Sequence, residues 1–144
     1  QTARRILHTE ARVPANALYK TWHMPGRFHE DYYAVDLLSD VLSRGHSSRL
    51  HQQLVKEKEL FTSISSFVTG TIDPGMLIVS GRLKEGVSLE HAEQEVDRVL
   101  ADVMQKPIPS DELEKVKNQA EANLVFGEVD VLNRAMNLAF AKLS

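Results

Sequence analysis

Six histidines carry the clearest chemical potential in this chain, because neutral imidazole is a common zinc ligand. A helical zinc-protease motif needs two histidines four residues apart with an adjacent glutamate. The six histidines never form that pattern, and the chain has no cysteine to complete a mixed site. They are His8, His23, His29, His46, His51 and His91. We therefore interpret them as surface or capping residues and expect no metal ligand in this chain.

His46 and His51 are the histidines with the most suggestive spacing, five residues apart. On one continuous α-helix, five residues correspond to a rotation of about 140°. The two rings would then point in widely different directions. This geometry predicts that the pair does not act together.

Serine chemistry is the next possibility, because Ser47 and Ser48 follow Gly45 closely. A nucleophile elbow has glycine on both sides of the serine, and that arrangement is absent. Serine is also a preferred residue at the start of a helix. We interpret the pair as helix-capping residues and predict no catalytic residue here.

Phosphate and acid–base chemistry also lack a basis in the sequence. The glycines at 26, 70, 75 and 81 are isolated, with no spacing that suits a phosphate cradle. The acidic stretch from Glu90 to Asp102 is typical of the solvated face of a helix. We therefore predict no cofactor-binding residue in this chain.

Length and composition indicate one soluble globular domain covering residues 1–144. The chain is 42% hydrophobic and 26% charged, and it begins at Gln1 without an initiator methionine. No apolar stretch approaches the roughly 20 residues that span a bilayer, and no signal peptide is evident. We expect a fragment of a larger chain without a membrane partner, in a compartment that composition leaves unknown.

Net charge argues against nucleic acid as a partner. The chain carries 17 basic and 20 acidic side chains, a net charge of −3. Acidic residues alternate with the basic ones in both halves, so no basic face is available to displace counterions from phosphates.

Hydrophobic periodicity predicts three strands and five helices. Alternating patterns place the strands at residues 15–23, 61–69 and 76–83, the last two forming an antiparallel hairpin. Helical patterns run from His29 to a C-cap at Gly45, from Ser47 or Ser48 to about Glu59, from Ser88 to Pro107, from Ser110, and again after Gly127.

This order of elements predicts an α+β fold, a two-layer sandwich with an antiparallel sheet and helices packed on one face. Three strands make a small sheet for so much helix. We therefore expect a further strand beyond Ser144, so that the domain is truncated before its last strand.

One long motif resembles a known family. Residues 33–60 contain a helix followed by Gly-x-Ser-Ser-Arg-Leu, and then the segment Leu54-Val55-Lys56-Glu57-Lys58-Glu59-Leu60. This progression resembles the second domain of M16 zinc metallopeptidases, the pitrilysin, insulinase and processing-peptidase group. The resemblance continues through Asp73-Pro74-Gly75 and the helix start at Ser110. It implies a LuxS/metallohydrolase-like sandwich, in agreement with the pattern of elements.

The resemblance also implies where catalysis would occur. In that family an inverted HxxEH motif on the first domain holds zinc, and this sequence has no match to it. Some second domains add an arginine and a tyrosine that contact substrate, and Val55 and Thr62 stand at those positions. Valine cannot donate a hydrogen bond, and a threonine hydroxyl lacks the reach of a phenol. The expected number of catalytic, cofactor-binding and metal-binding residues is therefore zero.

The implied role is a non-catalytic partner domain that helps enclose the peptide chamber of a bacterial zinc peptidase of the cytoplasm or periplasm. The implied partners are an N-terminal zinc-binding domain of the same chain, a peptide substrate, and a second M16 half or subunit. Zinc is implied for the parent chain alone. The alternative is a domain of a wholly inactive M16-like scaffold, similar to the core subunits of respiratory complexes.

Overall fold

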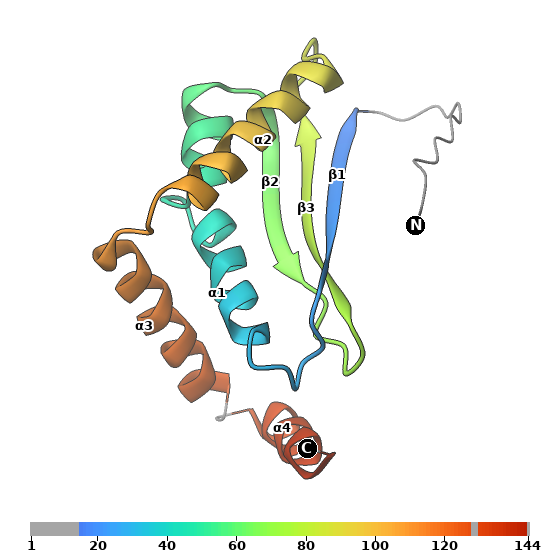
Figure 1. Ribbon diagram of the computed structural model, residues 1–144, viewed down its shortest axis with the longest axis vertical. Coiled ribbons are helices and arrows are strands. Elements are labelled where there is room, and N and C mark those ends of the chain that lie inside the picture. Colours follow the sequence, from blue (N-terminus) through green and yellow to red (C-terminus); the bar gives the residue numbers. More distant parts are fainter. Residues whose placement is uncertain (1–14, 128–129, 144) are drawn as a thin grey trace.

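The computed structural model describes residues 15–127 and 130–143, and within them the order of elements agrees with the sequence prediction. The chain passes through a strand, two helices, a hairpin of two strands and three helices (Figure 1). The strands are β1 (Ala17–Met24), β2 (Phe61–Val68) and β3 (Gly75–Leu83), and the helices are α1 (Tyr32–Ser43), η1 (His51–Glu57), α2 (Leu89–Gln105), α3 (Ser110–Gly127) and α4 (Val131–Leu143).

The three strands form an antiparallel sheet in the order β1-β3-β2. Gly81, on the central strand β3, lies opposite Leu18 of β1 and Ile64 of β2. The helices α1 and α2 lie on one side of this sheet (Figure 1). The predicted α+β sandwich is thus confirmed.

The core lies between the sheet and its covering helices. Its central side chains are at most 2% exposed and come from both the sheet and the helices. They are Leu42, Leu50, Leu54, Phe61, Val79, Val96 and Val99. Burying an aliphatic or aromatic side chain of this size stabilises a fold by about 1.5–3 kcal/mol. This cluster therefore holds the two layers together.

Gly81 is required where the sheet accommodates the ring of Phe61. A Cβ atom at Gly81 would lie 2.6 Å from Cδ1 of Phe61. Because glycine has no Cβ atom, the Phe61 ring can occupy that space, and it has no exposed area. Gly81, which belongs to no glycine motif in the sequence, is thus needed for the packing of Phe61.

The first helix begins later than predicted. The sequence places its start at His29, whereas α1 begins at Tyr32 with Asp31 at the N-cap. The preceding residues form turns instead, in which His29 N–H donates to the Gly26 carbonyl and Arg27 N–H donates to the Thr71 carbonyl. These contacts tie the chain to the β2–β3 loop and delay the helix. The predicted end is confirmed, since Gly45 has a φ of 80°.

The second helix also differs from its prediction. It spans His51–Glu57 as a π-helix, in which the N–H of Lys58 donates to the carbonyl of Gln53. Ser48 does not cap it through its side chain, because its hydroxyl donates to the Gly45 carbonyl at 2.7 Å. The predicted helix start at Ser48 is confirmed for the backbone, because residues 49–50 are helical and the N–H of Gln52 donates to the Ser48 carbonyl, whereas the Ser48 hydroxyl bonds within the preceding turn. At Ser88 the predicted cap is confirmed, with its hydroxyl accepting from His91 N–H.

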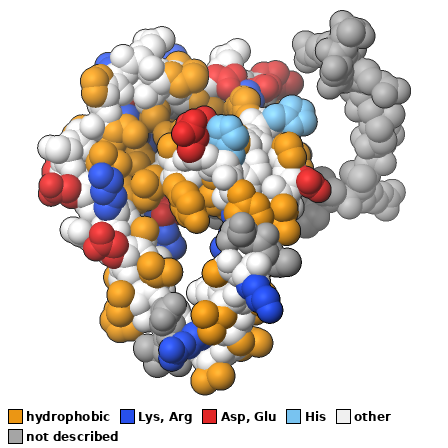
Figure 2. Space-filling model, turned by 60° about the horizontal axis from the view of Figure 1, so that its bottom comes forward, with side chains coloured by type: hydrophobic (Ala, Val, Ile, Leu, Met, Phe, Trp, Pro, Cys, Tyr) orange, Lys and Arg blue, Asp and Glu red, His pale blue; other side chains and the backbone are white. Residues whose placement is uncertain are grey.

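The C-terminal helices α3 and α4 have a different environment from the rest. Val116 is the one buried residue of α3, and the apolar side chains Leu124, Phe126, Leu132 and Leu138 are each more than 60% exposed. Figure 2 shows the surface of the molecule with this end turned forward. Hydrophobic side chains lie on the two lobes in the lower half of the view, on either side of a hollow. None of the helices described in this chain has the length and apolar character needed to cross a bilayer.

Candidate functional site

The candidate site is the junction of η1 and β2, where the M16 resemblance places substrate-contacting residues. Val55 lies on η1, half-buried, and packs against the core beside the fully buried Leu54. Thr62 is exposed at a bulge of β2, and its hydroxyl donates to the Arg82 carbonyl at 3.1 Å. Neither side chain therefore offers a free hydrogen-bond donor that extends far enough from the backbone to reach a bound peptide.

The turn between the two elements contains one unusual backbone conformation. Glu59 has a φ of 53°, a region that L-residues other than asparagine and aspartate rarely adopt. Its neighbours hold it there, because Leu60 N–H donates to the Leu54 carbonyl and Lys84 N–H donates to the Leu60 carbonyl, each at 2.9 Å. The turn is therefore fixed to both η1 and the end of β3.

The structure disperses most of the histidines. His23 lies on β1 opposite Met76, His29 precedes α1 with Nδ1 3.6 Å from Asp31, and His91 lies in the first turn of α2. His8 lies outside the described residues. Within residues 15–127 and 130–143, no three His, Cys, Asp or Glu side chains converge into a group that could hold a metal ion.

The prediction that His46 and His51 point apart was wrong. Nδ1 of His46 lies 3.4 Å from Nε2 of His51, and the ring centroids are 4.9 Å apart. The predicted angle assumed one continuous helix, but His46 occupies the turn after Gly45 and His51 is the first residue of η1. The turn folds His46 back over the start of the helix.

The two serines beside this turn have structural partners. Ser47 accepts a hydrogen bond from the ammonium group of Lys115, and Ser48 is buried against Gly45. Neither contacts a histidine in the hydrogen bonds that the structure records. Both hydroxyls therefore have hydrogen-bond partners within the fold.

Arg49 links three helices next to the candidate site. Its guanidinium donates to both carboxylate oxygens of Glu112 on α3, at 2.8–3.3 Å, and lies 3.6 Å from Asp102 on α2. The hydrogen bonds with Glu112 raise the pKa of Arg49. Hydrogen bonding from Lys106 is the main reason that the pKa of Asp102 is lowered. The network positions α3.

The acidic stretch of α2 is less solvated than predicted. Glu95 is 6% exposed and is paired with Lys58 and Arg98. Its hydrogen bond from Lys58 is the main cause of a lowered pKa. The predicted solvated face thus fails at Glu95, because the ammonium group of Lys58 from the end of η1 reaches over it.

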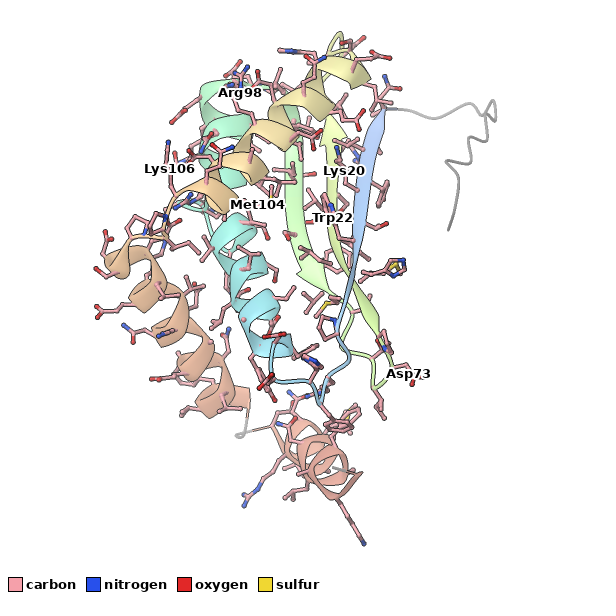
Figure 3. The ribbon with its side chains drawn as sticks, in the orientation of Figure 1. Lys20, Trp22, Asp73, Arg98, Met104 and Lys106 are labelled. Atoms are coloured by element: carbon pink, nitrogen blue, oxygen red, sulfur yellow. The ribbon has the colours of Figure 1, made fainter. Side chains whose placement is uncertain are left out.

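At the other face of α2, Lys20 of β1, labelled in Figure 3, lies between Glu93 and Asp97, at 3.1 and 2.6 Å from their carboxylates. Burial opposes the charge on Lys20, but its hydrogen bonds to both carboxylates raise the pKa of the ammonium group. The clamp fastens β1 to α2.

An apolar groove of about 370 Å³ lies between the sheet and its covering helices. Its lining includes Trp22 of β1 and Met104 of α2, which Figure 3 labels, together with Leu38, Leu77 and Leu100. Its lining contains one charged residue, Asp97, which is occupied by Lys20. The groove is therefore lined almost entirely by apolar side chains.

Comparison with known proteins agrees with this description. Residues 1–120 match the family model of the Peptidase M16 inactive domain. Over 97 residues the chain is 32% identical to the uncharacterized zinc protease YmxG of Bacillus subtilis. That match covers 67% of this chain and 24% of the relative, so the chain spans about a quarter of that protein.

Solved structures share the fold. A protease from Helicobacter pylori superposes with a TM-score of 0.83 at 24% identity, over 88% of this chain and 31% of that one. An inactive peptidase domain from Bordetella parapertussis superposes with a TM-score of 0.80 at 22% identity, over 94% of this chain and 74% of that one. With the family model covering most of its length, this chain belongs to the Peptidase M16 inactive domain family.

Proposed function

We propose that this chain is the non-catalytic partner domain of a zinc-dependent M16-type peptidase and helps to enclose its peptide chamber. The observation that carries this proposal is the match of residues 1–120 to the inactive domain of that family. The zinc would belong to an N-terminal domain of the same parent chain. A second M16 half or subunit would close the chamber from the other side.

The side chains at the candidate site support a role without direct chemistry. Val55 is engaged in core packing, and Thr62 is bonded to the Arg82 carbonyl. The arginine and tyrosine of other second domains would then come from another half or a partner subunit. A peptidase that encloses its substrate gains selectivity when closure completes the site.

The sheet offers a surface for the enclosing role. Its helix-free face carries Tyr19, Phe67 and Met76, which are 72%, 45% and 40% exposed. Cross-strand pairs place these side chains on one face, since Phe67 lies opposite Ile78 and Thr21 also lies opposite Ile78. Exposed apolar side chains on one face are suited to contact with an extended peptide or a second domain.

The two edges of the sheet bear on where the domain ends. Within the described residues β1 and β2 each have one neighbour in the sheet, so each leaves an edge unpaired. Natural sheets cover or blunt such edges. We propose that a further strand of the parent chain pairs with one of them.

The test compares the parent protein with the 144-residue chain. We expect the parent to retain zinc through dialysis against a chelator and to cleave unstructured fluorogenic peptides, whereas the chain alone does neither. The double substitution Val55→Arg and Thr62→Tyr should leave the isolated chain inactive, since the metal that would activate water is still missing.

Two outcomes would change the proposal. Peptide cleavage by the isolated chain would overturn the non-catalytic role. A parent that lacks zinc and leaves every peptide intact would instead favour the alternative, a wholly inactive M16-like scaffold.

A further inference from the structure

The turn between α1 and η1 brings together two imidazoles that the proposed function does not use. His46 is exposed on the turn, and His51 is half-buried at the start of η1. Two contacts hold the turn in place. The side-chain amide of Gln52 donates to the His46 carbonyl at 2.7 Å, and the backbone N–H of Ser48 donates to the Gly45 carbonyl at 3.2 Å. The turn is therefore held to the start of η1, and the facing ring nitrogens meet near the surface.

The separation of the facing nitrogens is informative. Nδ1 of His46 and Nε2 of His51 are 3.4 Å apart, which is long for an N–H···N hydrogen bond. Zinc–nitrogen bonds are about 2.0–2.1 Å, so two ligands at a tetrahedral angle around one ion are separated by about 3.3–3.4 Å. The observed separation thus equals the spacing of two imidazoles that share a metal ion.

The remaining ring nitrogen of His51 indicates how strong such a site can be. Nδ1 of His51 is buried and has no hydrogen-bond partner. Metal-bound histidines normally donate that second N–H to a carboxylate or carbonyl, which strengthens the site. His51 lacks that supporting hydrogen bond, and the described residues supply no third ligand. The site is therefore predicted to be weak, with water completing the coordination of the ion.

We propose that His46 and His51 form a two-ligand surface site for a divalent transition metal that prefers imidazole, such as Ni²⁺, Cu²⁺ or Zn²⁺. The bound ion would join the turn to the first residue of η1, with water in its other positions. This inference is independent of the proposed function, because it concerns neither the zinc of the parent nor peptide cleavage.

The test is calorimetric titration of Ni²⁺ into the metal-free 144-residue chain. We expect one ion per chain, with His46→Ala and His51→Ala each weakening binding by at least about tenfold. The double variant should bind no more weakly than the weaker single variant, because one ligand alone no longer chelates. His23→Ala is the matched control, an exposed histidine on β1 that should leave the affinity unchanged.

A second readout does not depend on affinity. Sub-stoichiometric Cu²⁺ should broaden the ring-proton NMR signals of His46 and His51 before those of His23, His29 and His91. The circular dichroism spectrum of each variant confirms that it is folded. Equal Ni²⁺ affinity of the wild type and His46→Ala, or Cu²⁺ broadening that begins at another histidine, would overturn the proposal.

Discussion

The sheet with its covering helices and the C-terminal pair of helices bury their apolar side chains to very different degrees. Every member of the described core cluster lies between Leu18 and Val99, in the strands, α1, η1 and α2 or the turns that join them. In α3 and α4, by contrast, Phe126 is 75% exposed and Leu132 is 68% exposed. A helical hydrophobic pattern therefore identifies a helix without determining what covers its apolar face.

The largest expected effect comes from replacing a leucine by alanine, and making this substitution once in each region tests the contrast between them. Leu54→Ala removes a side chain with no exposure, and we expect a loss of about 2–5 kcal/mol of unfolding free energy. Leu138→Ala on α4, where the side chain is 65% exposed, should change it by less than about 0.5 kcal/mol. Urea denaturation of both variants measures the difference. Equal losses would show that α4 is part of the core.

Glycine substitutions test the same contrast through overpacking. Gly81→Ala would place a methyl group against the Phe61 ring, and we expect a loss of about 1–3 kcal/mol. Gly127→Ala at the end of α3 has nothing within 4 Å and should be neutral or slightly stabilising. Thermal melting of the two variants in parallel gives the comparison. A neutral Gly81→Ala would contradict the close contact with Phe61.

The link between the two regions can be broken at Arg49. Its side chain is 14% exposed and forms a bidentate pair with Glu112 of α3. We expect Arg49→Ala to cost about 1.5–3 kcal/mol, since the hydrogen bonds involve charged groups. Hydrogen exchange should accelerate in α3 more than in the strands. Arg98→Ala, whose side chain is 72% exposed, is the control and should cost less than about 1 kcal/mol.

Glu95 makes stability within the core region depend on pH. Its folded-state pKa is lowered, so the carboxylate stabilises the fold above the unfolded-state pKa of about 4.3, and this contribution is lost as the pH falls through the folded-state value. We expect the unfolding free energy of the wild type to fall more steeply below about pH 5 than that of Glu95→Gln.

The matched control is Glu121→Gln, which removes an exposed carboxylate from α3. Urea denaturation at intervals from pH 7 to pH 3 provides the measurement. If Glu95→Gln follows the same acid profile as the wild type, the pairing with Lys58 does not contribute to stability.

The smallest expected effect is a gain at Glu59. Its φ of 53° strains an L-residue, so Glu59→Gly should stabilise the fold by about 0.5–1 kcal/mol, although it loses an exposed ion pair with Lys84. Glu57→Gly, in the last position of η1, should instead destabilise by about 1 kcal/mol. Chemical denaturation that ranks the two variants in the opposite order would contradict the strain at Glu59.

Much of the fold follows from local patterns in the sequence. The alternation along β2 and β3, the cap at Ser88 and the glycine after α1 each act through residues near in sequence, so they predict elements in the observed order. The M16 family was equally predictable from the sequence, because its motif lies in the contiguous residues 33–60.

The tertiary structure decided what depends on contacts distant in sequence. Glu95 is buried because Lys58 reaches it from η1, and α1 starts at Tyr32 because the preceding turns are bonded to the loop at Thr71. His46 meets His51 because a turn and a π-helix replace the continuous α-helix that the spacing assumed. Local propensity selects elements, whereas side-chain partners across the fold determine where those elements end and which polar groups meet.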